Sequence, residues 1–325
     1  MTAPPPVSIL VPTYQGARWI LETIGSALAQ TFCDFELLVV DDASSDGTPD
    51  LAASCRDPRV RVLANARRLG LVGNWNRSIA AARAPLVKFL FQDDLLRPPC
   101  LERMVEAFRE RPAAGLVFAR RAILVERDGS DDGGSWEGLA TARSACGDTP
   151  RWSPPRALFD PWIRAKALGN SIGEPTSVLL SRAALSAVGL FNPRMVQSPD
   201  MEMWARISFH FDVGFLDEEL TVFRAHARSA TRRNLLGARH WLDRLWLLEG
   251  LLDDPAIAAG TPVLARLRRQ ELRRVLRRLT LRRPEDRGLT PRRTLPGLRD
   301  YAARRLLRAL RLAEPLHPRL EASGA

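Results

Sequence analysis

The chain has 325 residues, of which 46% are hydrophobic and 26% are charged. This is enough apolar sequence for one large α/β domain with an appendage or for two modest domains, and it excludes a disordered or fibrous protein. The net charge of +11 arises in the last 65 residues, which contain 18 arginines, no lysine and six acidic residues. The preceding 260 residues are close to neutral, so we expect no nucleic acid as the main partner.

Nothing in the sequence indicates secretion or a membrane-spanning segment. The four cysteines are widely separated and lack a CxxC pair, which is typical of reduced thiols in a cytosolic protein. The longest apolar stretch, residues 241–252, is interrupted by charged residues, whereas a spanning helix needs about 20 largely apolar residues. We therefore expect a cytoplasmic protein that is soluble or peripheral on the inner face of the membrane.

Apolar runs typical of buried strands alternate with segments of helical periodicity. We expect strands at 7–11, 35–40, 60–63, 86–91, 115–125 and 177–181, and helices at about 19–28, 49–55, 73–82, 101–110, 182–188 and 201–209. This alternation predicts a doubly wound parallel sheet, which binds its ligands at the carboxyl ends of the strands.

The domain organisation follows from changes in composition. Residues 126–150 are rich in Gly, Asp and Ser without periodicity, and we expect a flexible insertion there. Beyond residue 223 Leu, Arg and Ala prevail, with helices expected at about 236–252, 262–282 and 298–312. We predict a domain over 1–235 and an Arg-rich helical extension over 236–325.

The sequence lacks the common phosphate-binding motifs. The turn after the first strand reads PTYQGARW, with one glycine where a dinucleotide-binding turn has three, and neither a P-loop nor a G-x-S-x-G elbow occurs. We therefore expect a metal to handle phosphate.

Two pairs of carboxylates follow predicted strands. Asp93 and Asp94 offer the hard oxygen ligands that suit Mg²⁺ or Mn²⁺ bridging a diphosphate, and the alternative is a pair of solvated acids opening a turn. Asp41 and Asp42 end a neighbouring strand, where a carboxylate can accept from a base N–H or a ribose hydroxyl, and the alternative there is an Asx turn.

Several segments together resemble the family-2 glycosyltransferases. They are VSILVPTYQGARWILETIGSALAQTFCDFELLVVDDASSDGT and FLFQDDLLRPPCLERM, followed by IGEPTSVLLSRAALSAVGLFNP, SPDMEMWARIS and VFRAHARSAT. The second segment resembles the one that bears the D-x-D-type metal motif of the family. The resemblance spans roughly residues 6–235. It implies a GT-A fold, a nucleotide-binding and mostly parallel sheet with helices on both faces.

The resemblance also implies roles for individual residues. The resemblance implies that the donor nucleotide pocket is lined by Pro12, Thr13 and Tyr14. It also implies that Asp42 contacts the nucleobase and that Asp93 approaches the ribose. It implies a metal ligand at Asp94 and a metal or diphosphate contact at His226, for which a histidine hydrogen-bonded in a loop is the alternative. It implies the catalytic base at Asp200, whose alternative is a helix N-cap.

Two departures from the family pattern concern this site. The commonest motif is D-x-D-D, and here its first position is Phe91. The usual acidic pair before the helix is Pro199-Asp200, so Glu202 is a candidate for the missing acidic neighbour. Glu174 in IGEPT is a second candidate on the acceptor side, with a turn or capping acid as the alternative.

The tail contains a basic amphipathic pattern. Leucines and a valine recur at roughly helical spacing between 264 and 279, and seven arginines between 266 and 278 occupy much of the remaining surface. Such a helix suits an anionic membrane, and the alternative is a solvated helix packed on the rest of the protein.

The sequence thus predicts a metal-dependent, inverting, hexosyltransferase-like glycosyltransferase. It would move a sugar from a nucleoside-diphosphate sugar, with UDP as the default, to an acceptor hydroxyl of a glycan or glycolipid in cell-surface polysaccharide synthesis. The alternatives are a sugar nucleotidyltransferase and a membrane-associated binding module that uses the basic tail. PTYQGARW lacks the Gly-rich loop with a basic residue that nucleotidyltransferases usually carry.

Overall fold

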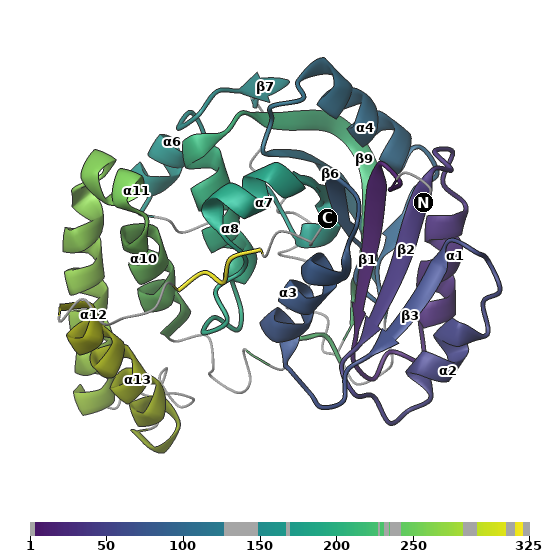
Figure 1. The fold of residues 1–325 in the computed structure, drawn as a ribbon. Helices are drawn as coiled ribbons and strands as arrows, with labels where there is room; N and C mark the ends of the chain where they lie inside the picture. The colour runs from purple at the N-terminus through teal and green to yellow at the C-terminus, as the bar shows by residue number, and fades with distance from the viewer. Residues whose placement is uncertain are drawn as a thin grey trace. The chain divides into compact units, whose positions relative to one another are not determined.

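The computed structural model describes residues 4–126, 149–166, 170–226, 228–230, 234, 242–281, 291–309 and 316–320, in two compact units (Figure 1). Unit 1 comprises Met1–Gly189, Ile207–Ala227 and Arg319–Ala325, and unit 2 comprises Leu190–Arg206 and Arg228–Pro318. Most of the predicted insertion, residues 127–148, lies outside the described residues. The predicted domain boundary at residue 235 stays a prediction.

Unit 1 is built on a mixed sheet. Its described strands follow the order β3-β2-β1-β4-β8-β6-β9-β5, and β7 pairs with β9. Their bounds are β1 Val7–Thr13, β2 Phe35–Asp41, β3 Val60–Ala64, β4 Leu86–Phe89, β5 Leu95–Leu96, β6 Leu116–Val125, β7 Trp152–Ser153, β8 Val178–Ser181 and β9 Val213–Ala225. The first four in this order are parallel, as the alternation of strands and helices predicted.

The other half of the sheet differs from a doubly wound parallel arrangement. β8 is antiparallel to β4 and β6, while β5 and β7 are antiparallel to β9. The long strand β9 was not predicted, because Asp217, Glu218 and Glu219 interrupt its apolar pattern. β9 pairs with β6 in parallel, with register shifts near Arg120. This pairing brings the C-terminal end of β9 into the unit that contains the acidic pair after β4.

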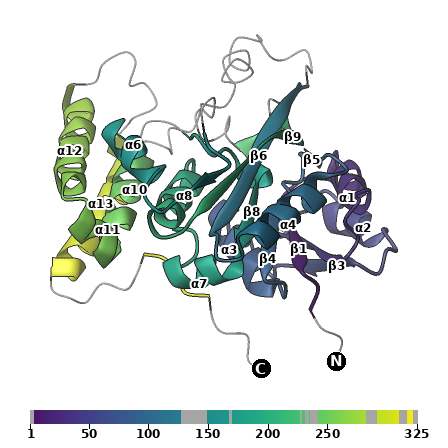
Figure 2. The same cartoon turned by 90° about the horizontal axis from the view of Figure 1, so that it is seen from above.

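Helices cover both faces of the sheet in unit 1, as predicted (Figures 1 and 2). The helices are α1 Ile20–Leu28, α2 Thr48–Ala53, α3 Leu71–Ala81, α4 Cys100–Glu110, α6 Phe159–Arg164 and α7 Arg182–Val188, with a short 3-10 turn η1 at Pro175–Ser177. Apolar residues of α1, α2 and α4 share one buried cluster with Val7, Ile9 and Val11 of β1. On α3, Trp75 packs its ring against Phe89 and Phe91.

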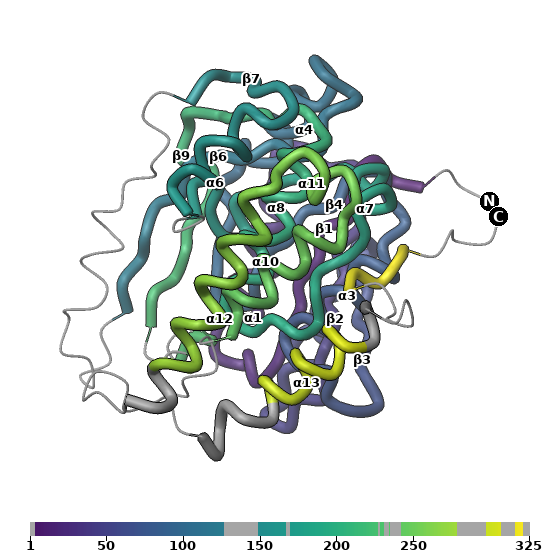
Figure 3. Tube along the Cα trace, turned by 90° about the vertical axis from the view of Figure 1, so that its left-hand side faces the viewer, coloured from purple at the N-terminus to yellow at the C-terminus, as the bar shows by residue number. Residues whose placement is uncertain are grey.

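Unit 2 contains the helices of the Arg-rich region. They are α10 Asp243–Asp253, α11 Pro255–Gly260, α12 Val263–Leu281 and α13 Pro291–Ala309, and α8 (Pro199–His210) has residues in both units. α10 and α12 lie side by side in unit 2 (Figures 2 and 3). α12 matches the helix expected at 262–282, and α13 begins earlier than the expected residue 298. None of the described helices combines the length and apolarity that a membrane crossing requires.

Candidate active site

The candidate site lies where parallel neighbouring strands of unit 1 end. β1 and β2 run in register to Thr13 and Asp41, and the Thr13 hydroxyl donates to Asp41 Oδ1 at 2.9 Å. β4 pairs with β1 on its other side, and the segment that follows β4 carries Asp93 and Asp94. Because carboxyl ends of parallel strands meet at one sheet edge, the predicted donor-binding segment and the predicted metal motif are neighbours.

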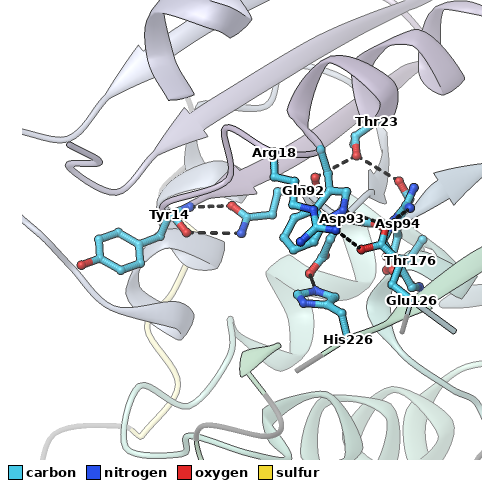
Figure 4. Close-up of polar contacts among 11 residues, drawn as sticks. Tyr14, Arg18, Thr23, Gln92, Asp93, Asp94, Glu126, Thr176 and His226 are labelled. Atoms are coloured by element: carbon cyan, nitrogen blue, oxygen red, sulfur yellow. Dashed lines mark hydrogen bonds and ion pairs between the residues drawn. The ribbon is translucent and has the colours of Figure 1, made fainter. Parts of the chain in front are cut away.

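Tyr14 is the partly exposed member of the predicted nucleotide pocket, whereas Pro12 and Thr13 are buried. The guanidinium carbon of Arg68 lies 3.9 Å from the centroid of the Tyr14 ring. The Tyr14 backbone is held by Gln92, whose Oε1 accepts from the Tyr14 N–H at 2.8 Å and whose Nε2 donates to the Tyr14 carbonyl at 3.2 Å (Figure 4). Sequence reasoning missed both Arg68 and Gln92.

Asp42, predicted to contact the base, is 2% exposed and already has three donors. The backbone N–H groups of Leu69 and Gly70 donate to its carboxylate at 2.6 and 2.8 Å, and Asn65 Nδ2 donates at 3.0 Å. These contacts fix the loop before α3, which also carries Arg68. The structure thus gives Asp42 a loop-anchoring role, and it leaves Tyr14 and Arg68 as the more accessible groups near the predicted base position.

Asp93 and His226 are brought together from distant parts of the sequence. His226 Nε2 lies 2.9 Å from Asp93 Oδ2 (Figure 4), and the His226 ring centroid lies 4.2 Å from that of Trp19. The Asp93 side chain is 19% exposed and that of His226 is 5% exposed. His226 was expected as a metal or diphosphate contact, a role that stays a prediction, and its ring lies against the Asp93 carboxylate.

Asp94, the predicted metal ligand, is 1% exposed and both of its oxygens are engaged. The Thr176 hydroxyl donates to Oδ2 at 2.6 Å, and the Arg224 backbone N–H donates to Oδ1 at 3.0 Å. Burial, followed by the negative charge of Asp93, raises the pKa of Asp94 well above its ordinary value. Asp94 therefore ties the segment after β4 to η1 and to β9.

A network of charged side chains surrounds the carbonyl of Asp93. Arg224 Nε donates to this carbonyl at 2.8 Å, and the guanidinium also contacts Glu126 at 2.5 Å and Glu22 at 2.7 Å. Trp19 Nε1 donates to the same Glu126 oxygen at 3.0 Å. Burial raises the pKa of Glu126, but the hydrogen bonds from Trp19 and Arg224 outweigh it and leave that pKa lowered. The motif VFRAHARSAT contains both Arg224 and His226, yet no pattern in the sequence indicated the role of Arg224.

The acceptor-side candidates are separated between the two units. Glu174, in unit 1, forms an ion pair with Arg121 Nε at 2.8 Å and keeps a side chain that is 24% exposed. Asp200 is 9% exposed in the first turn of α8, in unit 2. Its proposed role as a base stays a prediction.

Glu202, also in unit 2, is fully buried in an ion network. Arg206 donates Nε and Nη2 to its two oxygens at 2.8 and 3.0 Å, and His317 Nε2 lies 2.8 Å from Oε1. Burial alone raises the pKa of Glu202, but the charges of Arg206 and His317 outweigh burial and lower it to about 2. Glu202 is 0% exposed, and the acceptor-side role expected of it stays a prediction.

Comparisons with known proteins identify the class. A nucleotide-binding type of α/β sheet with an acidic pair after one of its parallel strands is the arrangement of the GT-A glycosyltransferases. The model of the family described as glycosyl transferase family 2 matches residues 8–148. The chain belongs to this glycosyltransferase family.

Two relatives and two solved structures illustrate the similarity. The uncharacterized protein MT1568 of Mycobacterium tuberculosis (strain CDC 1551 / Oshkosh) is 33% identical over 256 residues, which cover 78% of this chain and 77% of that protein. The succinoglycan biosynthesis protein ExoO of Rhizobium meliloti (strain 1021) is 45% identical over 125 residues, 38% of this chain and 35% of that protein. The chain therefore spans most of the first relative and about a third of the second.

The solved structures support the fold. S. aureus TarS 1-349 in complex with UDP-GlcNAc gives a TM-score of 0.59 at 16% identity, over 76% of this chain and 66% of that chain. The mannosyltransferase PcManGT from Pyrobaculum calidifontis, in complex with GDP-Man and Mn²⁺, gives 0.55 at 19% identity, over 97% of this chain and 83% of that chain.

Proposed function

We propose that the chain transfers a glycosyl group from a nucleoside-diphosphate sugar to an acceptor hydroxyl, with inversion at the anomeric carbon. The observation that carries this proposal is the pairing of Asp93 with His226 at the sheet edge where Tyr14 and Arg68 also lie. The donor complexes of TarS and PcManGT support a nucleotide sugar as the donor class. ExoO supports a polysaccharide as the product class.

The residues at this edge fit a divalent metal that is completed by the substrate. Asp93 and His226 offer one carboxylate and one imidazole, and Mg²⁺ is commonly held by one or two carboxylates together with substrate phosphates and water. In the described part of the chain no group of three or more His, Cys, Asp or Glu side chains is placed to hold a metal. We therefore propose Asp93 and His226 as the ligands of Mn²⁺ or Mg²⁺, and Asp94 as the residue that orients them.

When bound, the metal would offset the charge that develops on the departing diphosphate. The protein groups have separate tasks: Tyr14 and Arg68 hold the nucleoside, and Arg224 fixes the backbone of Asp93. Asp200 takes the proton of the acceptor hydroxyl as its oxygen attacks the anomeric carbon. The bond from that carbon to the diphosphate oxygen breaks, and its electron pair leaves with the nucleoside diphosphate.

Titration calorimetry with UDP and with GDP tests the donor and metal assignments. We expect binding with Mn²⁺ that is lost in EDTA, and a weaker affinity in Asp93→Asn and His226→Ala. Asp34→Asn, a change of an exposed acid in unit 1, serves as the control and should bind as the wild type does. Affinities that are equal with Mn²⁺ and with EDTA in all of these proteins would exclude the metal assignment.

We further propose that α12 associates with an anionic membrane surface. The arginines of unit 2 differ in exposure and in their partners. Inward arginines pair with acids, as Arg268 does with Glu249 and Arg304 with Asp253, both at 3.2 Å. Arg266, Arg269, Arg273 and Arg277 of α12 are all exposed. At about 100° per residue they fall within an arc of roughly 80° on the helix.

The exposed stripe has an apolar neighbour that favours a lipid surface. Leu276 is 47% exposed beside Arg277, whereas Leu264 and Val275 are buried. Basic residues attract anionic lipid headgroups, each by about 1 kcal/mol near the surface, and an apolar side chain adds insertion into the interface.

Sedimentation with vesicles of phosphatidylglycerol and phosphatidylcholine tests this association. The triple change of Arg266, Arg269 and Arg273 to Gln should reduce binding to anionic vesicles by about two orders of magnitude. The matched control changes three exposed arginines of unit 1, Arg56, Arg77 and Arg109, to Gln and alters the net charge equally. Equal losses in both triple variants, or no binding by the wild type at low salt, would contradict a role for α12.

A further inference from the structure

The side chain of Gln92 forms a bridge between the two loops that make the candidate site. One loop follows β1 and carries Tyr14, and the other follows β4 and carries Asp93. The backbone ladder between these strands continues to the bond from Leu90 N–H to the Leu10 carbonyl, at 2.9 Å. Beyond it, the Gln92 amide pairs with both the N–H and the carbonyl of Tyr14 (Figure 4). A side chain thus extends the pairing past the end of the strands.

Packing around the bridge leaves little freedom for the Gln92 amide. A Cβ on Gly16 would lie 2.5 Å from Gln92 Oε1 and 2.8 Å from its Cδ, so a side chain there would displace the Gln92 amide. The Thr23 hydroxyl also donates to the backbone carbonyl of Gln92, at 2.8 Å. The residue between Tyr14 and Gly16, Gln15, has a φ of 54°, a left-handed conformation that is uncommon for a residue with a side chain. The loop is therefore held in a turn that the chain alone does not favour.

We propose that Gln92 is a positioning residue that sets the distance between the nucleoside-binding group Tyr14 and the diphosphate-binding group Asp93. The inference rests on the proposed function, because it assigns the two loops to the two ends of one donor. Gln92 is adjacent to Asp93 in the chain and touches neither the metal nor the donor in this role. Its amide fits the task because it both donates and accepts, whereas a glutamate at this position could only accept from the Tyr14 N–H.

Two single variants break the bridge in different ways. Gln92→Ala removes the amide, and Gly16→Ala displaces it by steric contact. The double variant removes both the amide and the contact. If the bridge is the shared cause, the effects on donor affinity are not additive, and the double variant binds no worse than Gln92→Ala alone.

The chain offers a matched control for each variant. Gln30 is a second glutamine that bridges backbone groups, since it donates to the carbonyl of Arg97 at 2.8 Å and accepts from the Leu101 N–H at 2.9 Å. Gly25 is a glycine with open space around its Cβ position. Gln30→Ala should lower the stability of the fold without changing nucleotide affinity. Gly25→Ala should lower neither the stability nor the nucleotide affinity.

The experiment combines two measurements on the full chain. Hydrogen exchange without ligand reports the Tyr14 amide, and titration with UDP and with GDP in Mn²⁺ reports donor affinity. We expect faster exchange at Tyr14 in Gln92→Ala and about a tenfold higher Kd, the scale of one to two ordinary hydrogen bonds. Gly16→Ala should show the same faster exchange and higher Kd. Gln30→Ala and Gly25→Ala should show neither change.

Three results would overturn the inference. Unchanged exchange at Tyr14 in Gln92→Ala means that the bridge does not hold this loop. Faster exchange with an unchanged Kd means that the bridge serves the fold alone. Additive losses of affinity in the double variant mean that Gly16 acts independently of Gln92. If the wild type binds neither nucleotide, the proposed function fails and the inference is withdrawn with it, even where the exchange result of Gln92→Ala agrees.

Discussion

The change of Glu202 to Gln separates a structural role of this residue from a role in acceptor binding. The substitution keeps the shape of the side chain but removes its charge. Arg206 is then left fully buried without the carboxylate that it pairs with. Removing one member of a buried ion pair costs about 3–5 kcal/mol of unfolding free energy.

The pKa of Glu202 gives a second route to this magnitude. It lies at about 2 in the folded chain against an ordinary value of 4.5. At about 1.4 kcal/mol for each pH unit, the ionised carboxylate contributes about 3 kcal/mol. Because the folded pKa is the lower one, this contribution is present above pH 4.5 and is lost as the pH falls toward 2. Both routes give a similar loss.

Chemical denaturation at neutral pH and at pH 3 measures this loss, followed by hydrogen exchange at amides of unit 2. The control is Asp160→Asn, because Arg156 and Asp160 also form a pair four residues apart but are 39% and 36% exposed. We expect a change of about 0.5 kcal/mol or less there. If Glu202→Gln unfolds as the wild type does and sugar transfer falls, the reasoning is refuted and Glu202 acts on the acceptor.

Two further substitutions test the packing of unit 1. Gly115→Ala should destabilise it by about 1–3 kcal/mol, because the new Cβ would lie 2.5 Å from Ile207 and 2.6 Å from Phe211, and a thermal melt with no change would contradict this packing. Thr176→Val should cost about 1–3 kcal/mol by leaving Asp94 Oδ2 without its buried donor, and an unaltered denaturation midpoint would show that this bond contributes little.

The parallel half of the sheet was predictable because its strands are short apolar runs separated by helices of clear periodicity. β1 and β2 end close to where the apolar runs end, at Thr13 and Asp41. β9 was missed because three acidic residues in its middle break the apolar pattern and are nonetheless compatible with a strand near the sheet edge. Antiparallel pairing depends on contacts between residues far apart in the chain, and no local pattern specifies it.

The site was predictable in its residue types but not in its pairings. The family resemblance implied metal contacts at Asp94 and His226, and the fold buries Asp94 against Thr176 and places His226 beside Asp93. The bridge from Gln92 to Tyr14 joins residues 78 apart, and only the parallel pairing of β1 with β4 brings them together.

The same limit applies to the arginines of the tail. Helical periodicity placed them all on one polar surface, but which of them face inward depends on where acids lie on α10. Glu249 and Asp253 of α10 take Arg268 and Arg304 into buried ion pairs. The stripe on α12 consists of the exposed residues Arg266, Arg269, Arg273 and Arg277.

Turnover by Asp200→Asn tests the central claim most directly. A panel of UDP-, GDP- and dTDP-sugars in Mn²⁺ first identifies a donor from which the wild type releases nucleoside diphosphate. Asp200 lies in the first turn of α8, and Asn has nearly the same shape but cannot accept the proton of the acceptor, so folding and donor affinity should persist while transfer falls by about 10²- to 10⁴-fold. Transfer by the variant at the wild-type rate would contradict the proposed mechanism, and release of diphosphate from no donor by the wild type would contradict the proposed function itself.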